Sequence, residues 1–371
     1  MRRVRASLAA AVTVAGLSAG VVVGGASASG AATSGTAIPA AQKLVQALEQ
    51  RPTHIPTSEP ITKPIPKGKT IDWLQCSLST CTILTPAMQA AAKQLGWKVV
   101  AVPCGLTPTT VKAAWDVVVK NHPDAVVTSA FPRAIFTSEL QKLKSEHIPV
   151  VDFSTVDKPG NGITAVVQGV NNSIRVGTNF ADYVLATEGK KANALIVSSS
   201  VFSTLAPVVT AFKKEMTRLC PTCTVATLNE TGTSFGTTLP NDVVAYLKTH
   251  PTVNYVVPDE SAMNIGLPQA LASAGLADKV KITSRYPSQT TAQYLKQGSM
   301  DSLLMYQMTD ASWQMIDPLA RYFAGQSVKP SEVASPMWYL TPKTITKITY
   351  PYFLIQHYQT KYEQLWGVKK S

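Results

Sequence analysis

One segment of the sequence carries a pattern that could perform covalent catalysis. Gly232-Thr-Ser234-Phe-Gly236 matches G-x-S-x-G, in which a nucleophilic serine sits on a tight turn between a strand and a helix. Asp310 and His357 follow it in the Ser–Asp–His order of one class of hydrolases. However, Asn229-Glu230-Thr231 separates the pattern from the preceding apolar run, and Pro240 lies before the next helix. A secreted serine hydrolase using Ser234 is therefore an alternative, while a protein without catalysis is the favoured prediction.

The first residues have the composition of a secretory leader. Arg2, Arg3 and Arg5 precede a weakly apolar stretch, Ala6–Val23, and Ala26-Ser27-Ala28 offers a cleavage site. This pattern predicts a signal peptide, residues 1–28, cleaved near Ala28, and a secreted or extracytoplasmic protein. Glycines at 16, 20 and 24 would also suit a membrane anchor, but the stretch is poor in Leu, Ile and Phe. Because the first cysteine is Cys76, no lipoprotein anchor is expected at the cleavage site.

Exported proteins keep most of their cysteines in disulfides, and this chain has five cysteines. Cys76 and Cys81 flank the loop after the first predicted strand and Cys104 ends the second, so adjacent strands would bring these three together. Cys220-x-x-Cys223 follows a predicted helix, whereas a redox motif of this spacing belongs at a helix N-terminus. A local structural disulfide is favoured there. The disulfide candidates are Cys76, Cys81, Cys220 and Cys223, and one cysteine is left over in any pairing.

The charge pattern argues against several classes of partner. The formal net charge is +12, and it falls to +9 without residues 1–28, which hold three Arg and no acidic residue. The basic residues are dispersed, whereas nucleic-acid binding would need them clustered among aromatics. The five histidines are scattered without metal-ligand spacing. Neither G-x-G-x-x-G nor the Walker pattern occurs. We therefore expect no nucleic-acid partner, no metal and no cofactor.

The elements that must position any functional group alternate between strands and helices from Lys69 onward. Thr107-Pro108 and Thr85-Pro86 both place an N-cap before a proline that suits the first turn of a helix. Short apolar runs between such helices predict parallel sheets covered by helices, first as one βαβαβαβ domain and then as a second series. The predicted strands are 70–74, 97–102, 125–128, 149–153, 164–168, 194–197, 224–228, 253–257, 280–283 and 302–306.

Five segments, in order, resemble the type I periplasmic (solute-)binding protein family, in its sugar-type ABC transporter branch. They are Leu84–Val102 (LTPAMQAAAKQLGWKVVAV), Ile148–Ser154 (IPVVDFS), Val170–Asn172 with Gly177, Val256–Ala262 (VVPDESA) with Ala270–Gly275 (ALASAG), and Leu304–Gln307 (LMYQ). The resemblance spans roughly residues 69–345. Repressors share this fold, but no helix-turn-helix precedes it here.

The resemblance implies an α/β fold of two doubly wound parallel-sheet lobes joined by a three-crossover hinge, with crossovers near 154–160, 283–286 and 328–336. The expected organisation is a signal peptide (1–28), a flexible and poorly packed N-terminal arm (29–68), lobe 1 (69–154 plus 286–330), lobe 2 (155–285 plus 331–349) and a C-terminal helix or tail (350–371). It further implies a monomer that captures a small molecule between its lobes and delivers it to an ABC transporter permease. A secreted receptor that presents its ligand to a membrane sensor is the other alternative.

Carried over position by position, the resemblance also implies a set of ligand-binding residues. Aromatic faces would meet the C–H surface of a sugar ring, and planar polar groups would meet its hydroxyls. The implied residues are Leu78, Thr80, Phe131, Asp152, Phe153, Phe202, Asp259, Glu260, Arg285, Tyr286, Tyr306 and Gln307.

The sequence departs from the family pattern in the first loop, which is Cys76-Ser-Leu-Ser-Thr-Cys81 instead of carrying an aromatic pair. The helix segment Pro207–Phe212 lacks the usual arginine, and Phe131-Pro-Arg133 stands where the third strand usually ends near an Asp. These departures favour a less hydroxylated or partly apolar ligand over a typical hexose or pentose.

Overall fold

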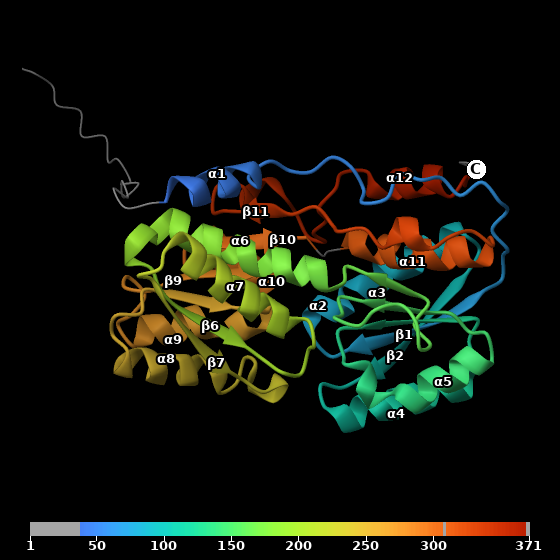
Figure 1. Ribbon diagram of the computed structural model, residues 1–371, viewed down its shortest axis with the longest axis horizontal. Coiled ribbons are helices and arrows are strands. Elements are labelled where there is room, and N and C mark those ends of the chain that lie inside the picture. Colours follow the sequence, from blue (N-terminus) through green and yellow to red (C-terminus); the bar gives the residue numbers. More distant parts are fainter. Residues whose placement is uncertain (1–37, 307–308, 369–371) are drawn as a thin grey trace, which may run out of the picture. The chain divides into compact units, whose positions relative to one another are not determined.

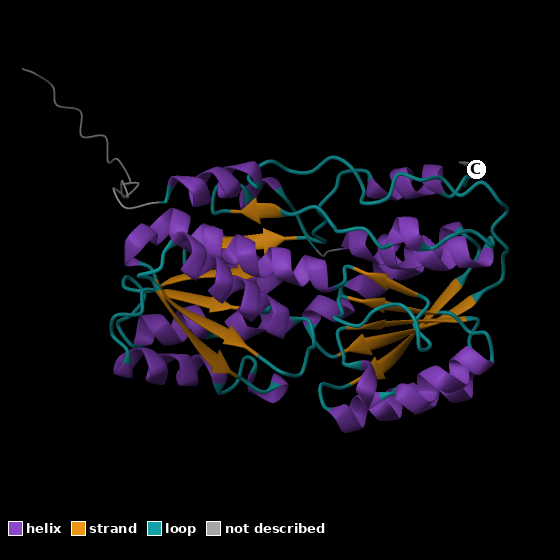
Figure 2. Ribbon diagram, in the orientation of Figure 1, coloured by secondary structure: helices purple, strands orange, loops and turns teal. Residues whose placement is uncertain are grey.

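The computed structural model describes residues 38–306 and 309–368, which belong to one compact unit, Thr36–Ser371 (Figure 1). The predicted signal peptide and Gln307 lie outside the described residues. Strands form two sheets, each with helices on both faces, as Figure 2 shows. Both sheets are parallel except for one strand, so the α/β fold class predicted from the sequence is confirmed. Among the described residues, no helix is both long and apolar enough to cross a membrane.

Lobe 1 is built on a five-stranded parallel sheet with the strand order β2-β1-β3-β4-β5. Its strands are β1 (Thr70–Cys76), β2 (Lys98–Cys104), β3 (Ala125–Ser129), β4 (Val150–Phe153) and β5 (Ala165–Val167). The central strands β3 and β4 are buried along their whole length, as expected for strands covered on both faces. Helices α4 (Pro108–Asn121) and α5 (Thr137–Ser145) cover one face, and α3 (Leu84–Gln94) and α11 (Thr309–Phe323) cover the other (Figure 1).

Lobe 2 is built on a six-stranded sheet with the order β11-β10-β9-β8-β6-β7. Its strands are β6 (Asn193–Ser198), β7 (Thr224–Asn229), β8 (Tyr255–Pro258), β9 (Lys281–Arg285), β10 (Ser302–Met305) and the antiparallel edge strand β11 (Trp338–Leu340). The helices are α6 (Val170–Glu188), α7 (Leu205–Leu219), α8 (Leu239–Thr249), α9 (Leu267–Ser273) and α10 (Gln289–Lys296). Gly177 lets α6 and α7 approach closely, because a Cβ there would lie 2.2 Å from the carbonyl oxygen of Val208.

The two predicted Thr-Pro helix starts have different outcomes. Thr107 caps α4, and its hydroxyl accepts a hydrogen bond from the backbone N–H of Thr110. Thr85 lies inside α3, which begins one residue earlier at Leu84. Its hydroxyl instead accepts a hydrogen bond from Trp73 Nε1 at 3.0 Å and donates one to Gln75 Oε1 at 2.5 Å. A tertiary contact with β1 thus replaces the local cap that the sequence suggested.

The chain passes from one lobe to the other at points that differ from two of the three predicted crossovers. β5 pairs with β4, so the first passage follows Val167 rather than residues 154–160. β10 pairs with β9 and β11, so the second passage lies between β10 and α11 rather than at 283–286. The third passage, between α11 and β11, contains the predicted segment 328–336. Both displaced strands are short apolar runs, and nothing local in such a run specifies which sheet it joins.

The N-terminal arm is packed against the C-terminal segment instead of being poorly packed as predicted. Helix α1 (Pro39–Ala47) contacts α6, and the arm after it follows the path of the chain end (Figure 1). Ile61 is buried, and its N–H donates to the carbonyl oxygen of Leu365 at 2.8 Å. The Arg51 guanidinium donates to the carbonyl oxygens of Phe353 and Leu354. Helix α12 (Tyr358–Leu365) packs on α11, within the segment for which a C-terminal helix was predicted.

Candidate functional site

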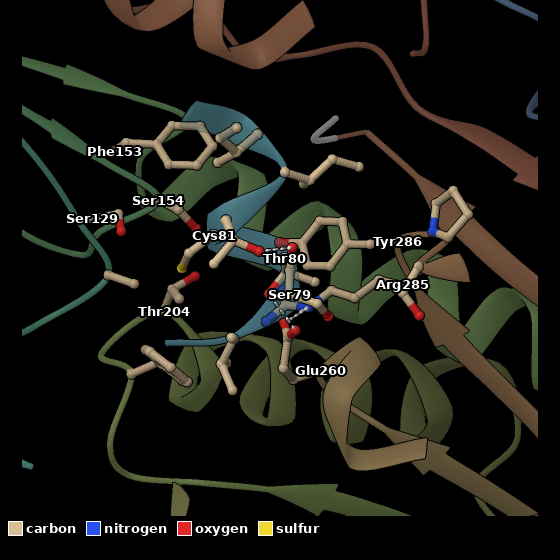
Figure 3. Close-up of a pocket in the computed structure, with 18 of the residues that line it drawn as sticks. Ser79, Thr80, Cys81, Ser129, Phe153, Ser154, Thr204, Glu260, Arg285 and Tyr286 are labelled. Atoms are coloured by element: carbon tan, nitrogen blue, oxygen red, sulfur yellow. Dashed lines mark hydrogen bonds and ion pairs between the residues drawn. The ribbon is translucent and has the colours of Figure 1, made fainter. Parts of the chain in front are cut away.

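A cavity of about 290 Å³ lies where the carboxyl ends of strands from both lobes face each other (Figure 3). Lobe 1 contributes residues that follow β1, β3 and β4, and lobe 2 contributes residues that follow β6, β8 and β9. In open α/β sheets this edge is where ligands bind. The volume suits a small molecule.

The lobe 1 wall centres on a short helix, α2 (Ser79–Thr82), held by a disulfide. Cys76, the last residue of β1, bonds to Cys81 with an S–S distance of 2.05 Å. This bond ties α2 to the end of the strand and presents Leu78 and Thr80 to the cavity. Cys220 and Cys223 form the second disulfide, as favoured from the sequence, so all four candidate cysteines are paired, and Cys104, whose fate the sequence left open, is the free, buried cysteine among the described residues.

Three residues that line the cavity have left-handed backbone conformations that are uncommon for side chains with a Cβ atom. Ala130, Ser154 and Tyr286 have φ values of 62°, 54° and 55°, and each follows directly on a strand. Such conformations cost on the order of 1–3 kcal/mol each and persist only where the surrounding structure imposes them. They turn the chain sharply at the sheet edge, so that backbone and side chains face the cavity.

The lobe 2 wall contains a buried charged cluster around Arg285, the last residue of β9. The Arg285 guanidinium lies 3.5 Å from Asp259 Oδ1 and 3.9 Å from Glu260 Oε2. Its Nη1 donates to the Tyr306 hydroxyl at 2.6 Å, and that hydroxyl lies 2.9 Å from the hydroxyl of Tyr286. Figure 3 shows Arg285, Tyr286 and Glu260 together beside α2. The cluster therefore presents one cation and a phenol to the cavity, backed by two carboxyl groups.

Hydrogen bonding within this cluster is incomplete. Neither oxygen of Asp259 accepts a hydrogen bond of ordinary geometry, and Arg285 Nε has no acceptor among the described residues. Burial raises the pKa of Asp259 to about 8, although Arg285 opposes the shift. Burial also raises the pKa of Glu260 against the same opposing charge. Burial thus disfavours the ionised form of both carboxyl groups, whereas the Arg285 charge favours it.

Direct contacts join the two lobes around the cavity. Thr80 of lobe 1 donates to Glu260 Oε1 of lobe 2 at 3.1 Å. The backbone N–H and the hydroxyl of Ser203 both donate to the carbonyl oxygen of Ala130, at 2.9 and 3.1 Å. The rings of Phe131 and Phe202 lie 5.5 Å apart between their centroids. The lobes are thus in contact across the site.

The structure brings together most of the residues that the sequence predicted for the site. Those that line the cavity are Leu78, Thr80, Phe153, Phe202, Glu260, Arg285 and Tyr286. Phe131, Asp259 and Tyr306 do not line it but contact residues that do. Asp152 is fully buried in β4 and does not line the cavity, so its predicted contact with a ligand has no support from this structure.

Sequence reasoning missed the small polar residues of the cavity. These are Ser79, Thr82, Ser129, Ser154, Thr204, Ser288, Gln289 and Thr290, together with Tyr350 from the C-terminal segment. A signal existed for Ser288, which caps α10 in a capping box with Thr291. Serines at strand ends are too common to stand out, and nothing near Tyr350 in the sequence indicates that it reaches a loop after β1.

The hydrolase pattern does not form a catalytic triad in the described residues. Ser234 lies in a 3-10 turn, Gly232–Ser234, and its hydroxyl donates to Glu230 Oε2 at 2.7 Å and to the carbonyl oxygen of Thr231 at 2.8 Å. No histidine hydrogen bonds to Ser234 within that part of the chain. Asp310 accepts from the N–H of Leu354. The described residues also contain no cluster of three potential metal ligands.

A family model described as "Periplasmic binding protein domain" matches residues 65–327. Among curated proteins, none matches the chain.

Three solved structures similar to this chain are sugar-related binding proteins by their titles. GanP, a glucose-galactose binding protein from Geobacillus stearothermophilus, has a TM-score of 0.67 at 17% identity, covering 75% of this chain and 99% of its own. A periplasmic solute binding protein of an ABC transporter from Actinobacillus succinogenes 130z, with bound D-allose, has a TM-score of 0.63 at 17% identity, covering 76% and 100%. A 5-methylthioribose transporter solute binding protein from Thermotoga lettingae TMO has a TM-score of 0.67 at 15% identity, covering 82% and 96%. At these identities, the likeness concerns the fold.

Proposed function

The chain belongs to the periplasmic binding protein domain family, and from this premise we propose that it captures a sugar-like, partly apolar small molecule between its lobes and delivers it to an ABC importer. The observation that carries the proposal is the cavity between facing strand ends, which combines aromatic rings with a buried arginine and several hydroxyls. In this proposal the protein works without catalysis and without a cofactor.

The mixture of side chains in the cavity matches the two surfaces of a sugar. Phe153, Phe202 and Tyr286 offer aromatic rings on which the C–H face of a pyranose or furanose ring would pack. Arg285 and Glu260 offer a charged donor and an acceptor, and charge-assisted hydrogen bonds to ligand hydroxyls are the stronger ones. The names of the three similar structures, which refer to glucose and galactose, D-allose and 5-methylthioribose, agree with a ligand of this class.

The two-lobed arrangement supports the proposed delivery to a permease. A ligand held by both walls would stabilise the closed form, because it contacts groups from both lobes only when they meet. A permease would then recognise the surface that closure creates. We further propose that the mature protein acts outside the cytoplasm as a monomer, after cleavage of the leader near Ala28.

The test is a thermal-shift screen of the mature chain, from Ser29, against monosaccharides, polyols, nucleosides, amino acids and small aromatic compounds. A ligand that binds only the folded state raises the melting temperature. At a free ligand concentration of 100 times Kd, it stabilises the folded state by about 2.7 kcal/mol. We expect a sugar or sugar derivative to raise it in the wild type and in Arg218→Ala, whose side chain is exposed on α7, but not in Arg285→Ala.

A lack of any shift across the panel would contradict the proposal. If that lack were accompanied by ester hydrolysis that disappears in Ser234→Ala, the hydrolase would replace the binding protein as the favoured function.

A further inference from the structure

A second cavity lies next to the first, beneath the segment that precedes α12. It is open to solvent and has a volume of about 550 Å³ between the start of α3 and the C-terminal segment. Its lining combines carbon-rich side chains (Ile83, Pro86, Ala87, Tyr350, Phe353 and Tyr358) with the polar residues Thr82, Thr309, Thr349 and Gln359. No charged residue of the described chain lines it. The C-terminal part of this wall lies beyond the residues that match the family model, 65–327.

The two cavities share part of their walls. Thr82, Ile83 and Tyr350 line both. The side chain of Tyr350 is 49% exposed, and its ring contacts Tyr352 edge-on with centroids 5.7 Å apart. Tyr350 thus lies at the boundary of the two cavities, and rotamer changes of exposed side chains are fast.

Three other residues of the second cavity, Phe353, Thr309 and Tyr358, are held by defined contacts. The Arg51 guanidinium lies over the Phe353 ring at 5.0 Å and donates to the carbonyl oxygen of Phe353. The Tyr358 hydroxyl donates to Thr309 Oγ1 at 3.2 Å, and that hydroxyl in turn donates to the carbonyl oxygen of Tyr352. The polar groups of Thr309 and Tyr358 are therefore already hydrogen-bonded, and this wall offers carbon surface to an occupant.

From this arrangement we propose that the ligand is a monosaccharide carrying an apolar aglycone, with the sugar in the first cavity and the aglycone in the second. The inference rests on the proposed function, because binding of the sugar in the first cavity positions the aglycone at the second. Moving an apolar group from water into a cavity lined by carbon contributes roughly 25 cal/mol for each Å² buried. Free hydroxyls in the same place would find side-chain partners chiefly at Thr82, Thr349 and Gln359, so most of this wall favours an apolar group.

The test compares free sugars with their phenyl glycosides by titration calorimetry. The pairs are D-glucose, D-galactose and D-xylose, each with its phenyl β-glycoside. At least one phenyl glycoside should bind at least ten times more tightly than its free sugar. Ala87→Trp, which fills the second cavity, should abolish this gain and leave any binding of the free sugar unchanged. Ala90→Trp, on the exposed side of the same helix, is the matched control and should keep the gain.

The outcomes separate this inference from the proposed function. If the sugars bind but the phenyl group brings no gain, or if the gain survives Ala87→Trp, the inference is overturned and the binding function stands. If neither sugars nor glycosides bind, the proposed function itself fails. Thermal unfolding establishes whether Ala87→Trp is folded, and Ala87→Leu serves as a smaller filler if it is not.

Discussion

Two buried arginine clusters in this chain have similar composition and differ in how completely their polar groups are hydrogen-bonded. Arg321 and Arg285 are each 1% exposed, and each lies beside an aspartate that is 0% exposed. Asp317 accepts hydrogen bonds from Arg321 Nε at 2.8 Å, from Ser331 at 2.5 Å and from Trp366 Nε1 at 2.8 Å. Asp259 lies 3.5 Å from Arg285 and accepts no hydrogen bond of ordinary geometry.

The difference reflects what each cluster holds. The Arg321 guanidinium also donates to the carbonyl oxygen of Glu59 and to the Thr57 hydroxyl, so this cluster fastens α11, the N-terminal arm and the chain end to one another. The Arg285 cluster borders a cavity. A buried polar group without a partner costs free energy, and a ligand that supplies the missing partners recovers it. We infer that the first cluster stabilises the fold, and that the second leaves the Arg285 guanidinium, which lines the cavity and lacks an acceptor at Nε, able to bind a ligand.

The largest effect is expected when the satisfied cluster is broken. Asp317→Ala leaves Arg321 buried without its counter-ion, which costs about 3–5 kcal/mol of stability for buried pairs. Urea unfolding followed by circular dichroism measures the loss. Asp317→Asn, which keeps the volume, should be less damaging. A loss below about 1 kcal/mol in Asp317→Ala would mean that the cluster does not stabilise the fold.

Breaking the incomplete cluster should affect binding more than folding. Arg285→Met keeps most of the side-chain volume but leaves Asp259 and Glu260 buried without their cation, and removing one partner of a buried pair costs up to about 3–5 kcal/mol. We expect a smaller loss of stability than in Asp317→Ala, because burial already raises the pKa of both carboxyl groups and each can take up a proton. Affinity for the ligand found in the screen should fall roughly 30- to 100-fold, as for a lost hydrogen bond to a charged group. Calorimetry measures the affinity, and an unchanged Kd would remove Arg285 from the site.

The raised pKa of Asp259 predicts that the free energy of unfolding depends on pH. Its pKa is about 8 in the folded chain and 3.8 for an ordinary aspartate, so the folded state binds this proton more tightly than the unfolded chain does. The folded state therefore loses stability as the pH rises from 4 toward 8, by at most about 1.4 kcal/mol per pH unit. Asp259→Asn removes this contribution, while the other buried carboxyl groups are common to both proteins.

Urea unfolding of both proteins at pH 5, 6 and 7 checks this prediction. The variant should gain stability relative to the wild type as the pH rises. If the free energy of unfolding changed equally with pH in both proteins, Asp259 would be ionised in the folded chain. The two aspartates would then differ only in the geometry of their hydrogen bonds.

The smallest effect concerns the contact between the lobes. Thr80→Val removes the hydroxyl that donates to Glu260, and one such hydrogen bond to a charged group contributes about 1.5 kcal/mol. Ligand affinity should fall roughly 10-fold, with stability nearly unchanged, whereas Thr80→Ser keeps the hydroxyl and should bind normally. Equal affinity in both variants, measured by calorimetry, would show that this contact does not help to close the site.

Much of the fold could be predicted because the signals are local. The alternation of apolar runs and amphipathic stretches indicates parallel sheets with covering helices, and Cys220-x-x-Cys223 brings its own partners together. Several site residues, such as Glu260 and Arg285, could be predicted because ligands in this fold bind at the ends of strands. Asp152 also lies near the end of a strand, yet it does not line the cavity, because its side chain is enclosed within lobe 1.

By itself the sequence determined the fold class, the family and the local Cys220–Cys223 disulfide, since each depends on neighbouring residues or on motifs in order, whereas the structure decided that Cys76 pairs with Cys81 and not with Cys104. Only the tertiary structure decided which sheet β5 and β10 join, how the N-terminal arm packs, and that Tyr350 reaches a cavity beside α2. It also decided that Asp317 is saturated with hydrogen bonds while Asp259 is not. These properties depend on partners far away in the chain. The periodicity of a short segment carries no information about which distant residues it will pack against or hydrogen-bond to.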